Sequence, residues 1–302
     1  MKDKPRLIHF ATPLLAVLLA VLAIHAPANA YGEGCPKRII SLSLASDEII
    51  LDIISDKSRI AGITYLAADE AVSNVASKAK GIKGIHANLE QVLELEPDLV
   101  IVAKFTSPNF IRQLENAGAN VLLLKDLNSF QEIRENIEAI GRAICERDNA
   151  EALVGKMDEE LAEIGRSLPK SPRRLRVLYY SLSGFTAGAH TTMGEIIEKA
   201  GALNLAAQAG ISGHKKISIE SVISLNPDVI ILSSDNPSDK DSVQGFISRS
   251  TLRKLDAVRE GRVIIMQAKH MTTASHYIVG GVRELAKKFQ RIKIKTDDDN
   301  KT

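Results

Sequence analysis

The chain has 302 residues, of which 45% are hydrophobic and 25% charged, so it can bury the cores of about two ordinary domains. Its formal net charge is +2. Residues 1–30 carry three basic side chains and one acidic one, so the remainder of the chain is neutral. This balance gives no electrostatic footprint for nucleic acid, and we expect no nucleic-acid partner.

The first thirty residues have the pattern of an export signal. Lys2, Lys4 and Arg6 precede an apolar stretch at 14–24, and residues 27–30 end in the small-x-small pattern of a cleavage site. The apolar stretch is short for a membrane span. We therefore predict a signal peptide at 1–30 that is cleaved to release a periplasmic protein. An uncleaved N-terminal anchor is the alternative.

The two cysteines leave their pairing open. Cys35 lies eleven residues beyond Ile24, whereas the cysteine of a lipoprotein directly follows the apolar core, so lipid anchoring is not expected. Cys35 and Cys145 could form a disulfide in an oxidising compartment. Cys145 also lies in a helical pattern, where a buried free thiol is the more common role.

Strands and helices alternate from residue 38 onward. Apolar runs predict strands at 38–42, 60–64, 99–102, 121–124, 176–180, 229–232 and 263–266. Helical periodicity and caps predict helices at 46–54, 110–116, 193–200 and 251–258, the first with Ser46 as its N-cap. This alternation indicates a parallel sheet in each half of the chain.

One segment occurs twice. Residues 89–102 return at 219–232 with a constant offset of 130 (219 − 89). Each copy has the pattern of a short amphipathic helix, a Pro-Asp turn and an apolar four-residue strand. The chain is therefore predicted to contain two copies of one α/β unit, and two lobes imply a cleft between them.

A long helical pattern joins the halves. Ser129 and Glu132 form a capping box, apolar residues recur with helical spacing, and Pro169 ends the run. We predict one continuous helix of about 55 Å, which would limit the lobes to small hinge movements. Two shorter helices broken near 146–150 are the alternative. The predicted organisation is an N-terminal lobe at 31–128, a linking helix at 129–168, a C-terminal lobe at 169–290 and a polar tail at 291–302.

The order of these motifs resembles the periplasmic substrate-binding proteins of ABC importers for ferric siderophores, cobalamin and haem. The resemblance is carried by residues 38–48, 62–65, the two Glu-containing copies and the helical region between them, and it covers about residues 36–290. It implies an α/β fold in which two Rossmann-like lobes with parallel sheets are joined by a single long backbone α-helix. It also implies an iron or cobalt chelate as bound ligand, no intrinsic cofactor and no catalysis.

Glu90 and Glu220 occupy equivalent positions in the two copies. Each stands two residues after a candidate N-cap, so each lies in the first turn of a helix. The resemblance implies that the pair docks on the two subunits of an inner-membrane ABC permease, which works with ATPase subunits. An acidic residue in a first turn also stabilises the helix dipole without any partner. We expect the protein to be a monomer.

The ligand site is expected beyond the carboxyl ends of the strands, where open α/β sheets bind ligands. Candidate ligand contacts in those loops are the aromatic, histidine and methionine side chains Tyr65, Phe105, Phe185, His190, His214, His270, Met271 and His276. Tyr65 with His214 or His270 could supply axial ligands to a metal chelate. Alternatively, the histidines could contact carboxylates or phosphates of an anionic chelate together with the lysines of these loops, Lys83, Lys104, Lys215 and Lys269, or they could be ordinary solvated loop residues. The chain has no tryptophan and only 4% aromatic residues, so siderophore, cobalamin and haem all stay open.

Two other functions fit part of the pattern. A zinc or manganese receptor shares the helix-linked architecture but needs several histidines and carboxylates from both lobes, and His86 is the only histidine between residues 31 and 128. A tetrapyrrole metal chelatase has a related two-lobed fold. The sequence has no nucleophile elbow, phosphate loop or paired His-Glu metalloprotease motif, so we favour the receptor.

Overall fold

A computed structural model describes residues 34–170, 173–233, 244, 245, 247, 248, 251–266, 268–271 and 273–292. The chain divides into a unit before Gly34 and a compact unit from Gly34 onward, and the fold described below belongs to the second. The predicted signal peptide and residues 293–302 of the predicted polar tail lie outside the described residues. Within the described part, no helix is long and apolar enough to cross a membrane.

The N-terminal lobe is built on a five-stranded parallel sheet of order β3-β2-β1-β4-β5. Its strands are β1 (Ile39–Ser41), β2 (Ile60–Thr64), β3 (Gly84–Ile85), β4 (Leu99–Val102) and β5 (Val121–Leu123). Its helices are α1 (Leu44–Ile53), α2 (Leu89–Glu94) and α3 (Pro108–Asn116), with 3-10 turns at Lys57–Arg59 and Tyr65–Ala68. Every residue of β1 and β4 is buried, as their apolar runs predicted. Ser43 rather than Ser46 caps α1.

The C-terminal lobe has a four-stranded parallel sheet of order β11-β10-β6-β8 and a separate antiparallel ribbon of β7 and β9. The strands are β6 (Arg176–Ser181), β7 (Phe185–Ala187), β8 (Leu203–Asn204), β9 (His214–Lys216), β10 (Val229–Ser233) and β11 (Val263–Ile265). The helices are α6 (Thr192–Lys199), α7 (Leu205–Gln208), α8 (Ile219–Leu225), α10 (Asp256–Arg259), α11 (Ala268–Met271) and α12 (Ile278–Gln290). The helix predicted at 251–258 is instead a 3-10 turn, Thr251–Lys254, followed by α10.

The repeated segment forms the same structure in both lobes, namely α2 with β4 and α8 with β10. Glu96 and Asn226 follow these helices in the same left-handed conformation, each with φ 43°. Arg38 and Arg176 open the first strands of their sheets. Arg38 Nε donates to the carbonyl oxygen of Glu96 at 3.0 Å, and Arg176 Nη1 donates to that of Asn226 at 3.1 Å. The structural repeat therefore includes one arginine in each lobe, which lies outside the repeated sequence segments 89–102 and 219–232.

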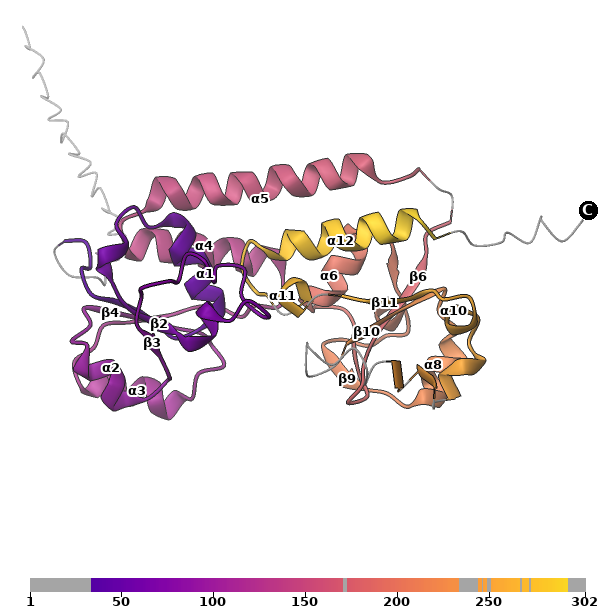
Figure 1. Cartoon of the computed structure of the whole chain (residues 1–302), viewed down its shortest axis with the longest axis horizontal. Coiled ribbons are helices and arrows are strands. Elements are labelled where there is room, and N and C mark those ends of the chain that lie inside the picture. The colour runs from indigo at the N-terminus through magenta and orange to yellow at the C-terminus, as the bar shows by residue number, and fades with distance from the viewer. Residues whose placement is uncertain are drawn as a thin grey trace, which may run out of the picture. The chain divides into compact units, whose positions relative to one another are not determined.

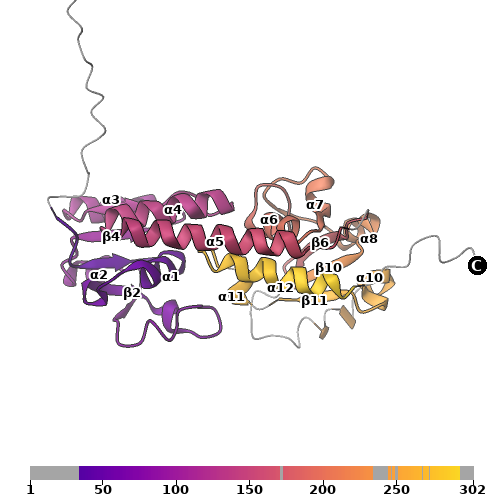
Figure 2. The ribbon, with the colours of Figure 1, turned by 90° about the horizontal axis from the view of Figure 1, so that it is seen from above.

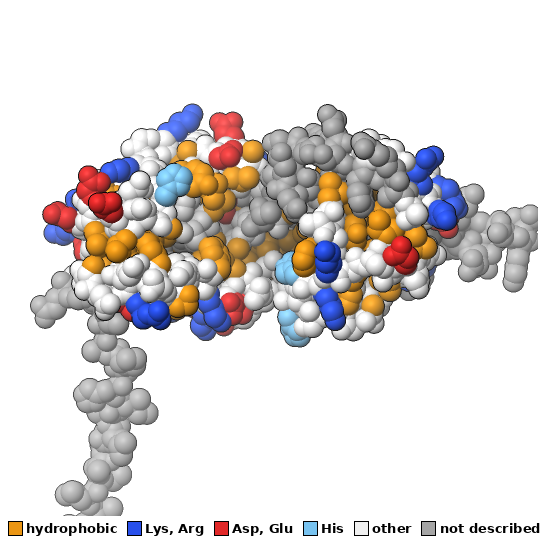
Figure 3. Space-filling model, turned by 90° about the horizontal axis from the view of Figure 1, so that it is seen from below, with side chains coloured by type: hydrophobic (Ala, Val, Ile, Leu, Met, Phe, Trp, Pro, Cys, Tyr) orange, Lys and Arg blue, Asp and Glu red, His pale blue; other side chains and the backbone are white. Residues whose placement is uncertain are grey.

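The predicted α/β fold of two parallel-sheet lobes joined by one long helix is confirmed, with α5 (Arg147–Ser167) as that helix. Figures 1 and 2 show α5 extending from the N-terminal lobe to the C-terminal lobe, with α12 alongside it. Its 21 residues measure about 31 Å. Figure 3, which views the face opposite α5, shows a hollow between the lobes with hydrophobic side chains around it. The limits given above for the lobes stay a prediction.

The continuous helix predicted at 129–168 is wrong, and two helices occupy this region. α4 (Phe130–Ala143) and α5 are separated by a turn in which Cys145 has φ 59°. Figure 1 shows α4 lying beneath α5, and α4 also packs on α1 of the N-terminal lobe. The periodicity continues through the turn because both helices bury apolar side chains, among them Ile140 and Met157.

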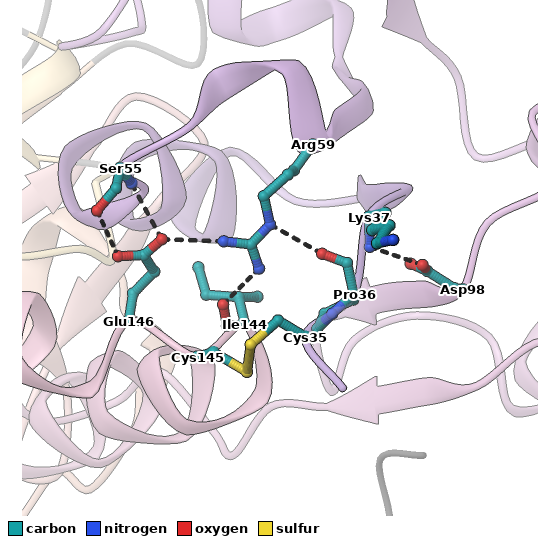
Figure 4. Close-up of a disulfide and its surroundings, with 9 residues drawn as sticks. All are labelled: Cys35, Pro36, Lys37, Ser55, Arg59, Asp98, Ile144, Cys145 and Glu146. Atoms are coloured by element: carbon teal, nitrogen blue, oxygen red, sulfur yellow. Dashed lines mark hydrogen bonds and ion pairs between the residues drawn. A yellow bond between two sulfur atoms is a disulfide. The ribbon is translucent and has the colours of Figure 1, made fainter. Parts of the chain in front are cut away.

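The turn between α4 and α5 holds a disulfide from Cys35 to Cys145, with 5.6 Å between their Cα atoms. Cys145 is therefore not a buried free thiol. Figure 4 shows the polar contacts around the bond. Arg59 donates to the carbonyl oxygen of Pro36 at 2.8 Å and pairs with Glu146 at 2.9 Å, and Ser55 Oγ donates to the other Glu146 oxygen at 2.7 Å. The first described residues are thus fixed to the start of α5.

A buried carboxylate connects the lobes a second time. Glu48, on α1 of the N-terminal lobe, has no exposed surface. Its Oε2 accepts hydrogen bonds from Thr273 at 2.6 Å and Ser275 at 2.5 Å, in the segment that precedes α12. Its Oε1 accepts from the backbone N and side-chain Nδ2 of Asn74 at 3.0 and 2.8 Å. These four hydrogen bonds satisfy both oxygens of a side chain that would be strongly unfavourable if it were buried without partners.

Candidate functional site

Three large aromatic side chains are exposed beyond the carboxyl ends of strands. Tyr65 follows β2 and is 52% exposed, Phe105 follows β4 and is 76% exposed, and Phe185 begins the β7–β9 ribbon after β6 and is 42% exposed. Aromatic side chains of this size can each offer a large apolar surface to a ligand. They come from both lobes, as a ligand held between the lobes requires.

Tyr65 stands against His86 in the N-terminal lobe. Their ring centroids are 4.3 Å apart and the ring planes are tilted by 35°. The two residues are neighbours because β2 and β3 pair in parallel and end at the same edge of the sheet. His86 was not among the candidate ligand contacts. The signal that could have found it is β3, but that strand has only two residues and no recognisable apolar run.

His214 lies on the ribbon together with Phe185. In the antiparallel register, Phe185 is opposite Lys216 and Ala187 is opposite His214. Opposed residues and residues two positions apart share a face of a sheet, so Phe185, His214 and Lys216 lie on one face of the ribbon. All three are exposed. Figure 3 shows histidine, basic and hydrophobic side chains together on the C-terminal lobe beside the hollow.

His190 lines a different cavity, of about 400 Å³, at the N-terminal ends of α4 and α6. Ser129 and Glu132 line it from α4 and Glu195 from α6. Glu195 accepts a hydrogen bond from the backbone N of Phe130 at 2.9 Å, so this region is also a contact between the lobes. His190 has a left-handed φ of 57° directly before the N-cap of α6.

His270 contacts a carboxylate through one ring nitrogen. Its Nδ1 is 2.7 Å from Oε2 of Glu284, and the ring lies against Gly280. Burial would raise the pKa of Glu284, but the hydrogen bonds from His270 and Lys288 outweigh it and hold this pKa below its usual value. A histidine whose Nδ1 is held by a carboxylate has the orientation typical of a metal ligand through Nε2. Met271 follows it at the end of α11 and is half-buried.

His276 is placed differently. Its Nε2 is 2.8 Å from Oδ2 of Asp52, and Tyr277 donates to the same oxygen at 2.7 Å. Burial would raise the pKa of Asp52, but hydrogen bonds from His276, Lys78 and Tyr277 lower it to about 2. The remaining nitrogen, Nδ1, is buried without a partner among the described residues. His276 therefore holds the segment before α12 to α1 of the N-terminal lobe.

The described residues contain no group of three or more histidine, cysteine, aspartate or glutamate side chains that could hold a bare metal ion. The candidate axial ligands Tyr65, His214 and His270 lie on three separate segments. Such residues could complete the coordination of a metal that a chelate already holds.

Glu90 and Glu220 lie in the first turns of α2 and α8, and both side chains are exposed. The N-caps Asn88 and Ser218 accept hydrogen bonds from backbone N atoms of these turns at 3.1 and 3.2 Å. The backbone N–H of Glu220 and the Ser218 hydroxyl hold the pKa of Glu220 below its usual value, so its side chain is ionised at neutral pH. Figure 1 shows α2 and α8 on the side of their lobes away from α5.

Comparison with known proteins agrees with this geometry. Residues 39–270 match the family model described as periplasmic binding protein. The chain is 28% identical over 260 residues to an uncharacterized ABC transporter substrate-binding lipoprotein, YvrC of Bacillus subtilis, covering 83% of this chain and 79% of that protein. It is 26% identical over 262 residues to a cobalamin-binding protein of Halobacterium salinarum, covering 86% and 71%.

A solved structure has the same fold. It is that of a possible iron-binding, periplasmic solute-binding protein from Staphylococcus epidermidis. The TM-score is 0.73 at 25% sequence identity, and the match covers 84% of this chain and 99% of the other.

Proposed function

Because the chain belongs to the family of periplasmic binding proteins, we propose that it is the substrate-binding component of an ABC importer. It captures a metal chelate between its lobes and delivers it to an inner-membrane permease that is driven by ATPase subunits. The observation that carries this proposal is the extent of the family match, which runs from β1 to α11 and so includes both sheets and α5.

The chelate is a corrinoid, a haem or a ferric siderophore, bound as transported ligand and not as a resident cofactor. The cobalamin-binding and possible iron-binding relatives support this class. The exposed side chains of Tyr65, Phe105 and Phe185 supply apolar contact surface on both lobes. Met271, which follows His270 in the sequence, adds to this surface. Tyr65, His214 and His270 are the side chains that we propose as contacts to the metal.

The test is the absorption spectrum of the protein purified from its native periplasm. A Soret band identifies haem, corrinoid bands identify cobalamin, and a catecholate or hydroxamate charge-transfer band identifies a siderophore. The ligand-free protein is then titrated with cyanocobalamin, hemin and a ferric siderophore. A protein that binds none of these chelates but binds zinc tightly would overturn the proposal in favour of a metal-ion receptor. Turnover of metal and tetrapyrrole beyond one equivalent would overturn it in favour of a chelatase.

Glu90 and Glu220 are proposed as the two contacts to the permease. They are equivalent in the repeat, exposed, and carried by helices on the same side of the two lobes (Figure 1). A permease with two equivalent subunits would meet two equivalent acidic side chains. We further propose that the importer component acts as a monomer.

Export completes the proposal. Members of this family act outside the inner membrane, and the predicted signal peptide would take this chain there. YvrC is described as a lipoprotein. The sulfur of Cys35 is bonded to Cys145 here, so it is not free to carry a lipid. Intact-mass analysis of the exported protein should give a chain that begins after residue 30, and a retained Met1 would contradict cleavage.

A further inference from the structure

We propose that the ribbon face formed by Phe185, His214 and Lys216 binds an acidic edge of the chelate, a carboxylate or phosphate group next to an apolar surface. This inference rests on the proposed function. It adds that the ligand carries an acidic group and states how the ligand is oriented between the lobes. The acidic edge faces the C-terminal lobe.

The first support is the strand register. Lys216 is directly opposite Phe185, and His214 is two positions from Lys216 on the same face. The neighbouring Lys215 is opposite Thr186 and so points to the other face. Thr186 is fully buried and donates to the carbonyl oxygen of Tyr179 at 2.6 Å. On the opposite face Ala187 is also buried, whereas Phe185, His214 and Lys216 are exposed. An aromatic ring, an imidazole and an ammonium group thus stand together, exposed, on one face of the ribbon.

The second support is the pairing of lysines at the two sheet edges. In the N-terminal lobe, Lys104 after β4 is paired with Asp126, and Lys125 after β5 is paired with Glu135 at 2.7 Å. Across the described part of the chain, Lys216 and His214 take part in no ion pair. The ammonium group of Lys216 is therefore available to an anion, as are those of Lys215 and Lys269, and of these three only Lys216 shares a ribbon face with Phe185 and His214.

The third support is that the ribbon is held in place before any ligand arrives. Gly184 donates to the carbonyl oxygen of Ser181 at 2.9 Å, and Ile217 donates to that of Gly184 at 2.9 Å, so the Phe185–Lys216 end of the ribbon is tied to the end of β6. Asn204 Nδ2 donates to the carbonyl oxygen of Ala187 at 3.1 Å. A rigid site loses less conformational entropy when it binds its ligand.

The chemistry matches a flat chelate with acidic substituents. The Phe185 ring offers an apolar face, and hydrogen bonds from an ammonium group or a protonated imidazole to an oxyanion are stronger than those between neutral groups. Haem presents carboxylates, cobalamin presents a phosphodiester, and many ferric siderophores are anionic. The shared feature is an oxyanion beside an apolar surface.

The experiment compares acidic and non-acidic members of each ligand class. Hemin is paired with its dimethyl ester, cyanocobalamin with dicyanocobinamide, and ferric enterobactin with ferrioxamine B. For the class that the wild-type protein binds, we expect the acidic member to bind about tenfold more tightly. Lys216→Ala should remove most of this preference. The matched control Lys215→Ala, one residue away on the other face, should retain it.

The outcomes separate the two proposals. If both members of the bound class bind equally well, or if Lys215→Ala and Lys216→Ala lower the preference equally, the role of the ribbon face is wrong and the receptor function stands. If the wild-type protein binds none of the six chelates, the proposed function fails and this inference fails with it. Circular dichroism of both variants should match the wild type, since both side chains are exposed.

Discussion

Two adjacent acidic residues of α1 are buried inside this protein. Asp47 and Glu48 are adjacent and both fully buried, yet they face different neighbours. Glu48 is satisfied by Asn74, Thr273 and Ser275, whereas Oδ1 of Asp47 has no hydrogen-bond partner among the described residues. The two carboxyl groups should therefore respond in different ways to substitution and to pH.

Replacing Glu48 should strongly destabilise the fold. Glu48→Ala leaves the hydroxyls of Thr273 and Ser275 and the two nitrogens of Asn74 without their acceptor. We expect the free energy of unfolding to fall by about 3 kcal/mol. Urea denaturation measures this change. The control Glu70→Ala removes an exposed carboxylate and should change little, and an equal loss in both variants would contradict the role of Glu48.

Asp47 should make stability fall as the pH rises. The pKa of Asp47 is raised from 3.8 to about 7, chiefly because the carboxyl group is buried. Hydrogen bonds from Ser41 and Thr64 act to lower this pKa but do not outweigh burial. The folded chain therefore holds a proton that the unfolded chain releases near pH 4. The contribution of this proton to the free energy of unfolding is complete below about pH 4 and is lost as the pH rises to about 7. In this range the free energy of unfolding falls by at most about 1.4 kcal/mol per pH unit.

Urea denaturation between pH 5 and pH 7 tests this dependence. Asp47→Asn removes the titrating group and should flatten the slope. Asp52 and Glu284 have lowered pKa values, so their contributions change at lower pH, outside this window. An unchanged slope in Asp47→Asn would assign the dependence to another group.

At the scale of elements, the turn between α4 and α5 depends on a close approach. A Cβ atom at Gly141 would lie 2.3 Å from Cβ of Ala150, which is closer than two side chains can pack. Gly141→Ala should lower the free energy of unfolding by about 2 kcal/mol because the helices must separate. Gly155, in α5, has open space where its Cβ would be. Gly155→Ala should therefore stabilise by about 0.5 to 1 kcal/mol.

Thermal and urea denaturation of the two alanine variants provide the comparison. Both changes add one methyl group within a helix, so they differ chiefly in the space around it. A gain in stability for Gly141→Ala similar to that for Gly155→Ala would show that the helices are not packed this closely.

Which elements could be predicted depended on how local their signals were. The strand at 99–102 matches the structure because it is a complete apolar run, and the strand at 60–64 matches because apolar residues fill most of it. The break at Cys145 was given only as the alternative, near 146–150, because the apolar periodicity continues through it, while the disulfide that holds it joins residues 110 positions apart. β3, β7 and β9 were missed because these short strands contain glycine or polar residues and form no apolar run.

The candidate site could be predicted only in part for the same reason. Tyr65 and Phe185 were recognisable as exposed aromatics after strands, but Lys216 acquires its role from the β7–β9 register. His276 looked like a loop histidine in sequence. Its attachment to Asp52 depends on a contact between residues 224 positions apart, which a local pattern cannot reveal.

At the scale of the whole molecule, the repeated glutamates should matter for transport and not for ligand binding. Replacing both Glu90 and Glu220 by alanine removes the two acidic contacts that we propose for the permease. We expect transport to be lost while the affinity of the purified protein for its chelate is unchanged. Uptake of the labelled chelate by cells and titration of the isolated protein measure the two properties.

Glu115→Ala, which changes another exposed glutamate of the N-terminal lobe, is the matched control and should leave transport intact. Weakened chelate affinity in the double variant would contradict docking as the role of the pair. Transport at the wild-type rate would contradict it as well.

The attachment of Glu48 also sets the order in which the molecule can be completed. Its partners Thr273 and Ser275 are 225 and 227 positions further along the chain. A growing polypeptide therefore contains the whole sheet of its first lobe long before the groups that satisfy this carboxylate have been synthesised. The first lobe therefore lacks two of the hydrogen bonds to Glu48 until the segment before α12 is present.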